Sequence, residues 1–597
     1  MRLDHAMSDD TVRRLMAAMV FLASLVIYMM TMAATVSFWD AGEFIAVSYI
    51  LGIPHSPGTP LYVLVGRVFA MLPLALSVAQ RVNLLSAFTA ALGVMMVYLI
   101  IVEVVRFMFG EAKTAASRIA AHAGGLVGSL FLMFSDTYWT DAIEAEVYAL
   151  SAFVMGLCTW LALKWLRAHP DDSASASDEG RSRGLILLII YLLSLGIGFH
   201  LGTILVFGGI FLTILMVKEK SFSNFEFLVI SFGIAVILAD MMIWRNTTLT
   251  LVLLGVFGLL LVWTSLSQGR FALYATLLFI LGLSVHLFMY VRSFHDPAID
   301  MVDPQNWDAM YAHLRREQYP PIDVFARKAS PLFQIKHFWN YFTEQFRLFG
   351  DVRLGFFDLG MVSVLVPLTL GIWGIVANFL REKKTWVLNF AVLLLNSAGL
   401  IIFLNFSDSE VRERDYFYGG AFFYFSIFIG IGAASLLALV IDEVKAKSRD
   451  ALKWTAMAAA VLVILAILPA RYPWFSHDRS EYHIPRDYDY NILSGLEPDA
   501  IIFTNGDNDT YPSSSIQTLE GFRPDVNIAN LSLLNTSWYI RQLRDRKPPV
   551  PISLDDAEIE RLRPIVLKDG RVAWRRDLVM PHIKKENTWK RPSDVAG

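Results

Sequence analysis

Residues 15–44 read LMAAMVFLASLVIYMMTMAATVSFWDAGEF, an apolar run that ends in two carboxylates, Asp40 and Glu43. An apolar run of about 20 residues predicts a helix that crosses a bilayer. A carboxylate is costly at the centre of the bilayer and much less so at its surface, so acids directly after the helix are tolerable. The pair is therefore either a polar helix end or the start of a site at the membrane surface.

The composition excludes a soluble globular protein. Apolar residues make up 55% of the 597 residues and charged residues 18%, and the mean hydropathy is +0.49. These values are typical of a multi-pass membrane protein. A net charge of −3 without a long basic block gives no sign of a nucleic-acid partner. The single cysteine, Cys158, lies in an apolar stretch, so we expect it to be buried and to form no intrachain disulfide.

Long apolar runs predict about thirteen membrane-spanning helices, with an uncertainty of about one, and hence an all-α multi-pass fold. Because the first run is too long for the core of a signal peptide, we expect it to be retained as a span. Residues 61–76 are shorter and interrupted by Pro73, which favours a segment at the interface. The predicted spans are 15–35, 83–105, 119–135, 147–166, 184–199, 201–217, 226–243, 247–264, 271–292, 357–380, 386–406, 420–441 and 453–470.

Basic residues gather at alternate ends of these spans. Lys and Arg in short loops favour the cytoplasmic side, so a cytoplasmic N-terminus leaves every inner loop basic. We expect a bacterial inner (plasma) membrane protein in this orientation. Arg245, Arg412 and Arg414 are the exceptions, because they fall in short outer loops. The predicted outer segments are 36–82, 136–146, the turn near 200, 244–246, 293–356, 407–419 and the tail from 471.

The unusual polar segments all fall on this outer face. Arginine forks bind phosphate, aromatic rings pack on sugar rings, and a carboxylate can take a proton from a hydroxyl. Such a set suits a sugar-phosphate lipid at the boundary between water and lipid. The candidate residues are Asp40, Glu43, His55, Glu144, Glu146, His200, Arg292, His295, Arg412, Arg414 and Tyr416.

Each candidate also has a purely structural interpretation. Arg412 and Arg414 could pair with acids in their own loop. His200 could cap a helix, and His55 could belong to a proline-rich turn that redirects the chain. Glu144 and Glu146 immediately precede a span and would point to different sides of a helix, so at most one needs a functional role.

Five stretches, in order, resemble the protein O-mannosyltransferase-like membrane family, formerly a domain of unknown function, in the GT-C glycosyltransferase superfamily. The similarity extends over nearly the whole chain. One difference is a serine, Ser56, where a second proline is expected, which loosens that turn slightly. The five stretches are Phe38–Phe44, His55–Pro60, Glu144–Tyr148, Arg412–Tyr418 and Asn505–Thr510.

The resemblance implies a GT-C enzyme that moves a sugar from a polyprenyl-phosphate carrier to an acceptor hydroxyl on the outer face. The family suggests mannose as the sugar and a protein Ser or Thr as the acceptor, although a glycan acceptor stays open. The matching first-loop acid is Asp40 or Glu43; we favour Asp40 as the base, with Glu43 orienting the acceptor or holding the base. Arg412 and Arg414 would then bind the carrier phosphate. His55, Glu144, Glu146, His200, Arg292, His295 and Tyr416 are secondary candidates for substrate binding.

No obligatory cofactor is expected. The paired acids also permit a divalent metal, because hard oxygen ligands suit Mg²⁺ or Mn²⁺. The expected partners are the bilayer, a polyprenyl-phosphate-linked sugar and an acceptor protein or glycan.

Residues 471–597 have the composition of a soluble α/β domain, which we expect outside the cytoplasm and separate from a catalytic membrane domain at 1–470. Asp499–Thr510 predicts a strand and a turn-rich loop, Val526–Asn530 a second strand, and residues 511–521 a helix between them. Asp507, Asn508 and Asp509 favour an Asx-rich turn, because the other ligands of an acidic calcium loop are missing.

A transporter or flippase of lipid-linked sugars is the alternative function. Asp240 lies inside a predicted span, near its end, and is the one intramembrane acid that such a protein could use. Against this, the charged residues gather at the outer face, and no inverted repeat is evident in the sequence.

Overall fold

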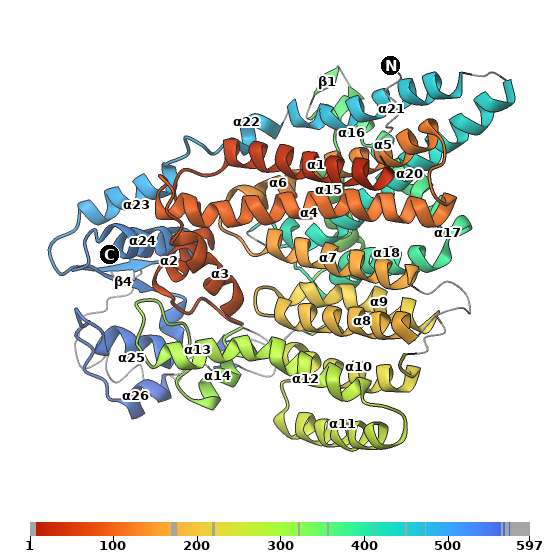
Figure 1. Ribbon diagram of the computed structural model, residues 1–597. Helices are drawn as coiled ribbons and strands as arrows, with labels where there is room; N and C mark the ends of the chain where they lie inside the picture. Colours follow the sequence, from red (N-terminus) through yellow and green to blue (C-terminus); the bar gives the residue numbers. More distant parts are fainter. Residues whose placement is uncertain are drawn as a thin grey trace.

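The computed structural model describes residues 8–168, 176–217, 221–319, 323–350, 352–354, 357–410, 412–447, 450–471, 473–562, 565–566 and 572–573. Long helices lie side by side in one bundle, and the N-terminus is at the opposite end from the carboxyl-terminal domain (Figure 1). The bundle helices are α1 (Asp9–Thr31), α4 (Val78–Phe109), α5 (Ala115–Met133), α7 (Tyr148–Arg167), α8 (Ala176–Gly196), α9 (Val206–Leu215), α10 (Asn224–Ala239), α11 (Thr247–Ser267), α12 (Phe271–Leu283), α13 (Leu287–Ser293), α17 (Leu365–Arg381), α18 (Lys383–Leu394), α19 (Leu400–Leu404), α20 (Gly419–Lys447) and α21 (Ala451–Ile467).

The predicted fold class is confirmed. Among the described residues, ten helices are long and apolar enough to cross a membrane, or eleven if the bent pair of α5 and α6 (Asp136–Ile143) is one span. Of the thirteen expected spans, ten correspond to these helices, 119–135 corresponds to the bent pair, and the remaining two are not among them. Residues 184–199 fall on α8, and residues 201–217 form η1 (Leu201–Leu205) and the short α9.

The centre of the bundle is closely packed because small residues face one another. A Cβ atom on Gly128 of α5 would lie 2.6 Å from the Ser426 carbonyl oxygen of α20, and one on Gly430 would lie 2.6 Å from the Gly124 carbonyl oxygen. Helices in lipid associate through such close backbone approach. Cys158 is buried within α7, as expected.

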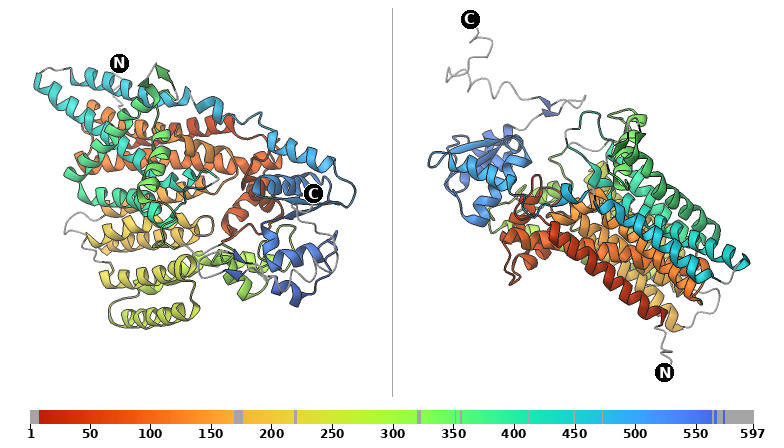
Figure 2. Two further views of the ribbon diagram at one scale, coloured as in Figure 1. Left: turned by 180° about the vertical axis from the view of Figure 1, so that it is seen from behind. Right: turned by 90° about the horizontal axis from the view of Figure 1, so that it is seen from above.

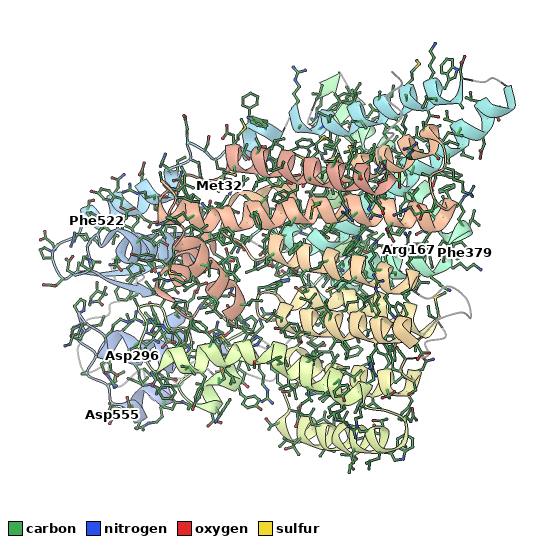
Figure 3. The ribbon with its side chains drawn as sticks, viewed as in Figure 1. Met32, Arg167, Asp296, Phe379, Phe522 and Asp555 are labelled. Atoms are coloured by element: carbon green, nitrogen blue, oxygen red, sulfur yellow. The ribbon has the colours of Figure 1, made fainter. Side chains whose placement is uncertain are left out.

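Shorter elements cover the end of the bundle where the predicted outer segments lie. α3 ends before Pro73 and is too short to span, which agrees with an interfacial segment. Figure 3 places Met32, Asp296 and Phe522 towards this end, and Arg167 and Phe379 at the other. These elements are α2 (Ala41–Ile50), α3 (Pro60–Ala70), α6, α14 (Trp307–Leu314), α15 (Pro331–Gln345), β1 (Arg353–Leu354), β2 (Phe357–Asp358), α16 (Leu359–Ser363) and α22 (Pro473–His477), with the single-turn segments η2 (Asp240–Trp244), η3 (Ser284–His286), η4 (Leu395–Gly399), η5 (Asp415–Tyr418) and η6 (Leu468–Arg471) in the bundle or at its ends.

The carboxyl-terminal domain contains the predicted β-α-β unit. Strand β3 (Ile501–Thr504) pairs in parallel with β4 (Asn527–Asn530), and α24 (Asp507–Glu520) connects them. The expected Asx turn at 507–509 is instead the first turn of α24, because the Asp509 carboxylate accepts the Asn505 and Gly506 amides. The domain lies beside α2 in both views of Figure 2. Its other elements are α23 (Ile484–Ser494), η7 (Leu533–Asn535), α25 (Ser537–Asp545), α26 (Asp556–Arg561), β5 (Ile565–Val566) and β6 (Val572–Ala573).

Candidate active site

The first loop holds Asp40 in position through the backbone of the residue before it. Trp39 has a φ of 64°, which is uncommon for a bulky residue. Its amide donates to Asn508 Oδ1 of α24 at 2.7 Å. Asp40 then begins α2, but its side chain makes no capping hydrogen bond to that helix. The carboxylate is therefore available to another partner.

That partner is Arg412. Arg412 Nη1 donates to Asp40 Oδ2 at 3.0 Å, with side-chain exposures of 15% and 20% respectively. The guanidinium lies between two aromatic rings, 4.4 Å from the centre of Trp39 and 4.8 Å from that of Tyr416. Burial lowers the pKa of Arg412, but the charge of Asp40 and its hydrogen bond, together with Tyr416 and Glu146, raise it by more, so the pKa is raised overall. The expected pairing of Arg412 within its own loop is not what the structure shows.

Glu43 is fully buried, and both oxygens of its carboxylate contact His55. One carboxylate oxygen accepts the His55 amide at 2.9 Å, and the other lies 2.5 Å from Nδ1 of the ring. Burial lowers the pKa of His55, whereas the contact with Glu43 raises it by more, so the net pKa is well above its ordinary value. The proline-rich turn is thereby tied to α2, one helical turn beyond Asp40.

The loop that carries Arg412 is fixed by side chains from α15. The Tyr341 hydroxyl donates to Glu413 at 2.6 Å and accepts the Arg414 amide at 3.0 Å. Arg414 Nη1 donates to the Tyr416 hydroxyl at 2.8 Å, and its Nε lies 3.6 Å from Glu410. Arg414 thus stands beside Arg412, with Tyr416 in contact with both.

The two glutamates before α7 have different surroundings. Glu144 forms an ion pair with Arg479, in the connection to the carboxyl-terminal domain. Glu146 is buried, and its backbone amide is held by Ser86 of α4 at 3.2 Å. Burial, and then the charges of Asp40 and Glu144, raise the pKa of Glu146 well above its ordinary value. Of this pair, Glu146 is therefore the carboxyl group whose pKa the charge of Asp40 raises.

The carboxyl-terminal domain adds residues that sequence reasoning did not place in the site. Ser515 donates to the Gly42 carbonyl at 2.5 Å, and a Cβ on Gly42 would lie 2.9 Å from the Tyr511 backbone. Burial, and then the negative charge of Asp40, raise the pKa of Asp507 to about 6. The sequence feature that indicates a site here is the position of Asn505–Thr510 at the carboxyl end of a predicted strand, since such loops often hold ligands.

Three predicted residues lie around the site without contacting Asp40. His200 caps η1 by accepting the Gly202 amide at 3.2 Å, and burial lowers its pKa to about 4. Arg292 donates to the Leu51 and Ile50 carbonyls, at 2.8 and 3.1 Å, and so closes the end of α2. His295 is exposed. The structure groups Asp40, Glu43, His55, Glu146, Arg412, Arg414 and Tyr416, and leaves Glu144, His200, Arg292 and His295 around them.

Asp240, on which the transporter alternative relied, has a partner. Arg315 binds its carboxylate with two nitrogens, at 2.9 to 3.1 Å, and Thr250 donates to it at 2.7 Å. Across the ranges that the structure describes, no group of three or more His, Cys, Asp or Glu side chains is placed to hold a metal ion.

Two regions of the chain match described protein families. Residues 40–223 match the "Protein O-mannosyl-transferase TMEM260 N-terminal domain", and residues 485–568 match "TMEM260-associated domain 2". Over these two regions the chain is similar to the protein O-mannosyl-transferase TMEM260 domains. The first match begins at Asp40, and the second includes all of α24, so Gly42 and Ser515, which form a hydrogen bond, both lie within matched regions, whereas Trp39 precedes the first region by one residue.

Two named relatives match most of this chain at low sequence identity. The chain is 20% identical to Protein O-mannosyl-transferase tmem260 of Dictyostelium discoideum, over 87% of this chain and 58% of the relative. It is 22% identical to Protein O-mannosyl-transferase TMEM260 of Mus musculus, over 89% of this chain and 64% of the relative. The chain therefore spans less than two thirds of either relative. Among solved structures, ArnT of Cupriavidus metallidurans bound to undecaprenyl phosphate aligns with a TM-score of 0.45 and 11% identity, over 87% of this chain and 91% of that one.

Proposed function

We propose that this protein is a membrane glycosyltransferase that moves a sugar from a polyprenyl-phosphate carrier to an acceptor hydroxyl. The observation that carries the proposal is the pairing of Asp40 with Arg412 between two aromatic rings. This pairing supports the proposal because a carboxylate, a guanidinium of the kind that binds phosphate and two aromatic rings of the kind that pack on sugars lie together. We take residues 1–470 as the membrane catalytic domain and 471–597 as the soluble domain that covers it.

The proposed reaction is a single displacement. The carrier phosphate binds Arg412 and Arg414 and draws Arg412 away from Asp40. Asp40 then accepts the proton of the acceptor hydroxyl, whose oxygen forms a bond to the anomeric carbon as the bond from that carbon to the phosphate oxygen breaks. The polyprenyl phosphate leaves with the bonding electrons, and the two arginines stabilise its charge. Attack from the opposite side inverts the anomeric centre.

The other residues have supporting roles in this proposal. Glu43 and His55 hold α2, and therefore Asp40, in place. Glu146 and Asp507 are carboxyl groups whose pKa values the charge of Asp40 raises, and we assign them to hydroxyls of the sugar or the acceptor. Raised pKa values suit carboxyl groups that must both accept and donate hydrogen bonds.

We further propose mannose as the sugar and a protein Ser or Thr as the acceptor, because the named relatives are protein O-mannosyltransferases. The site would face away from the cytoplasm, since the basic loops gather at the other end of the bundle. Labelling of a single cysteine introduced at Asp308, an exposed residue of the predicted outer segment 293–356, in intact cells tests this orientation. Protection of this cysteine from an impermeant reagent would reverse it.

The decisive experiment is transfer of radioactive sugar by the purified full-length chain, from polyprenyl-phosphate mannose to an acceptor protein. Asp40→Asn keeps the shape and removes the base, so we expect the rate to fall roughly 10²- to 10⁴-fold. Asp308→Asn, at an exposed acid of α14, is the matched control. Undiminished transfer by Asp40→Asn would reject the base assignment. Movement of a lipid-linked sugar across vesicles without any transfer would favour the flippase alternative instead.

A further inference from the structure

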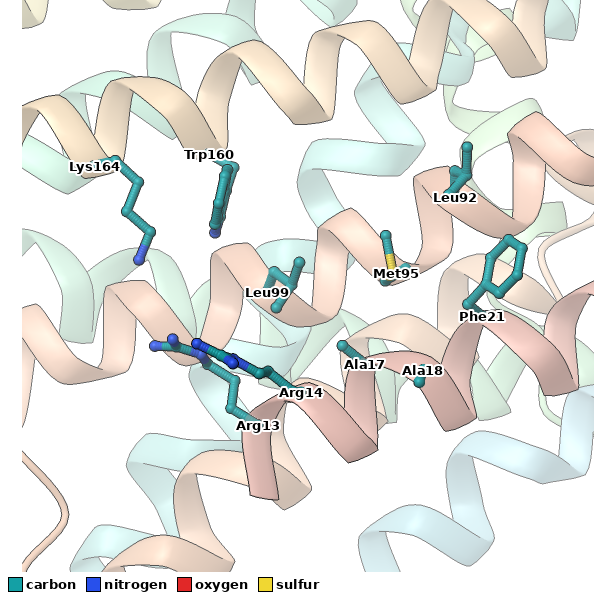
Figure 4. A pocket seen from close by; sticks show the side chains of 10 residues that line it. All are labelled: Arg13, Arg14, Ala17, Ala18, Phe21, Leu92, Met95, Leu99, Trp160 and Lys164. Carbon is teal, nitrogen blue, oxygen red and sulfur yellow. The ribbon is translucent and has the colours of Figure 1, made fainter. Parts of the chain in front are cut away.

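A cavity lies at the end of the bundle where α1 begins. It has a volume of about 550 Å³ and is lined by α1, α4 and α7. Figure 4 shows Arg13 and Arg14 of α1 and Lys164 of α7 reaching into one end of this space, with Phe21 and Leu92 at the other. The cavity is far from the candidate active site, because about 17 helical residues separate Arg14 from the end of α1, or roughly 25 Å.

The basic end of the cavity is held by a buried acid. Glu103 of α4 is fully buried, and its carboxylate lies 3.2 Å from Lys164 Nζ and 2.9 Å from Arg167 Nε. Arg13 and Arg106 approach the same carboxylate at 3.8 and 3.9 Å. The remaining acids here are exposed or half-buried: Asp10 beside Arg13, Glu111 beside Arg106, and Asp9 beside His122. The cations outnumber the carboxylates, so the cavity mouth attracts an anion.

The rest of the cavity is apolar and opens onto the lipid. Ala17 and Ala18 leave space beside α1, and Met95 and Leu99 of α4 form the facing wall. Phe21 lies two helical turns beyond Arg14, so the apolar part continues for roughly 10 Å from the basic end. The neighbouring side chains of α1 face the lipid, since Leu15 is 54% exposed and Leu22 is 56% exposed. Trp160, over which the Lys164 ammonium lies at 5.0 Å, is a typical residue for the headgroup level.

We propose that this cavity binds one anionic phospholipid from the surrounding leaflet. Arg14 and Lys164, with Arg13, bind the headgroup phosphate, and one acyl chain lies along Phe21, Met95 and Leu99. A neutral phospholipid would leave the excess positive charge unbalanced, whereas a soluble anion would leave the apolar wall uncovered. Basic recesses between spanning helices are recognised binding places for acidic lipid headgroups. The inference is independent of the glycosyltransferase proposal, because it uses none of the residues of that site.

The test measures lipid binding to the delipidated full-length chain in detergent, by native mass spectrometry, with phosphatidylglycerol and phosphatidylcholine as probes. We expect the unmodified chain to prefer phosphatidylglycerol at least about five-fold. Arg14→Gln and Lys164→Gln should each weaken phosphatidylglycerol binding by a similar factor. Ala18→Leu, which fills the groove without changing charge, should weaken it too. Arg270→Gln removes a cation from a loop assigned to the same side of the membrane and should have no effect.

Three outcomes would overturn the proposal. The first is equal binding of the two lipids by the unmodified chain. The second is an effect of Arg270→Gln as large as that of Arg14→Gln, which would indicate a general surface-charge effect. The third is preferential retention of polyprenyl phosphate over phosphatidylglycerol, which would make the occupant a carrier lipid. Because Arg14 is exposed, its substitution should not disturb folding, and thermal unfolding of each variant checks this.

Discussion

Asp40 and Arg412 are 372 residues apart in the chain, yet their side chains meet at 3.0 Å. Each is held by other contacts: Asp40 through the Trp39 backbone and α2, and Arg412 by the rings of Trp39 and Tyr416. A free carboxylate would be a better base than a paired one. The pair therefore suits an enzyme in which the arrival of the donor phosphate releases the base.

Substitution of Arg412 by lysine should separate the contribution of its positive charge to transfer from the contribution of the guanidinium shape. Lysine keeps one positive charge but loses the planar fork and its stacking on two rings. We expect kcat/KM for the lipid-linked donor to fall roughly 10- to 150-fold, the size of a lost charge-assisted hydrogen bond. Arg486→Lys, at a surface ion pair with Glu520, is the matched control and should leave transfer unchanged. Equal effects of the two variants would remove the phosphate role from Arg412.

The pair of His55 and Glu43 predicts a pH dependence of stability. Because the pKa of His55 is raised in the folded protein, its stabilising contribution is complete below the ordinary histidine value of about 6.5. The contribution is lost as the pH rises through the raised value. We expect the melting temperature of the purified wild type to exceed that of His55→Gln most at pH 6. The difference between the two melting temperatures should shrink in alkaline buffer. A difference that is constant with pH would contradict the charged pair.

The contact between α24 and the first loop should matter for turnover. Asn508→Ala leaves the Trp39 amide without its acceptor, at a cost of about 1 to 3 kcal/mol if no water replaces it. We expect kcat to fall while KM for the donor changes little, because Asn508 positions the base and does not bind the carrier. Asn491→Ala, in α23 of the same domain, is a control for general weakening of the domain. If both variants lose activity in parallel, Asn508 is structural only.

The buried pair of Asp240 and Arg315 tests the transporter alternative. Arg315→Met leaves a buried carboxylate without its charge partner, which costs about 3 to 5 kcal/mol when such a pair is broken. The double variant Asp240→Leu with Arg315→Met should recover most of that stability and retain sugar transfer. Thermal unfolding and the transfer assay measure the two effects. A stable double variant that has lost all activity would assign Asp240 a functional role.

The sequence indicated the architecture because hydrophobic length and loop charge are local properties. The apolar run after Arg14 became α1, and the short run before Pro73 became the short helix α3. The count of spans was less certain, since η1 and α9 are too short to cross as an isolated helix but are long enough to resemble a span in sequence.

The candidate site was predictable as a list of residues on one face, but not as a set of contacts. Charge bias placed Asp40 and Arg412 on the same side, whereas their ion pair depends on how α2 and the loop after α19 dock in three dimensions. The partner of Glu144 is Arg479, which no local pattern singles out. The contact of the first turn of α24 with Trp39 was not predicted for a related reason. An Asp- and Asn-rich stretch has the same local sequence whether it is exposed to solvent or packs against Trp39.

The hydrogen bond from the Trp39 amide to Asn508 also imposes an order on biosynthesis. The two residues are 469 positions apart, so at about 5 to 20 residues per second roughly 25 to 95 seconds of translation separate them. During that time the first loop has left the ribosome but lacks its acceptor. The spanning helices can insert one after another, whereas the first loop takes its final shape only when the last fifth of the chain arrives. A prematurely terminated chain would thus be a membrane-inserted bundle with an unassembled first loop.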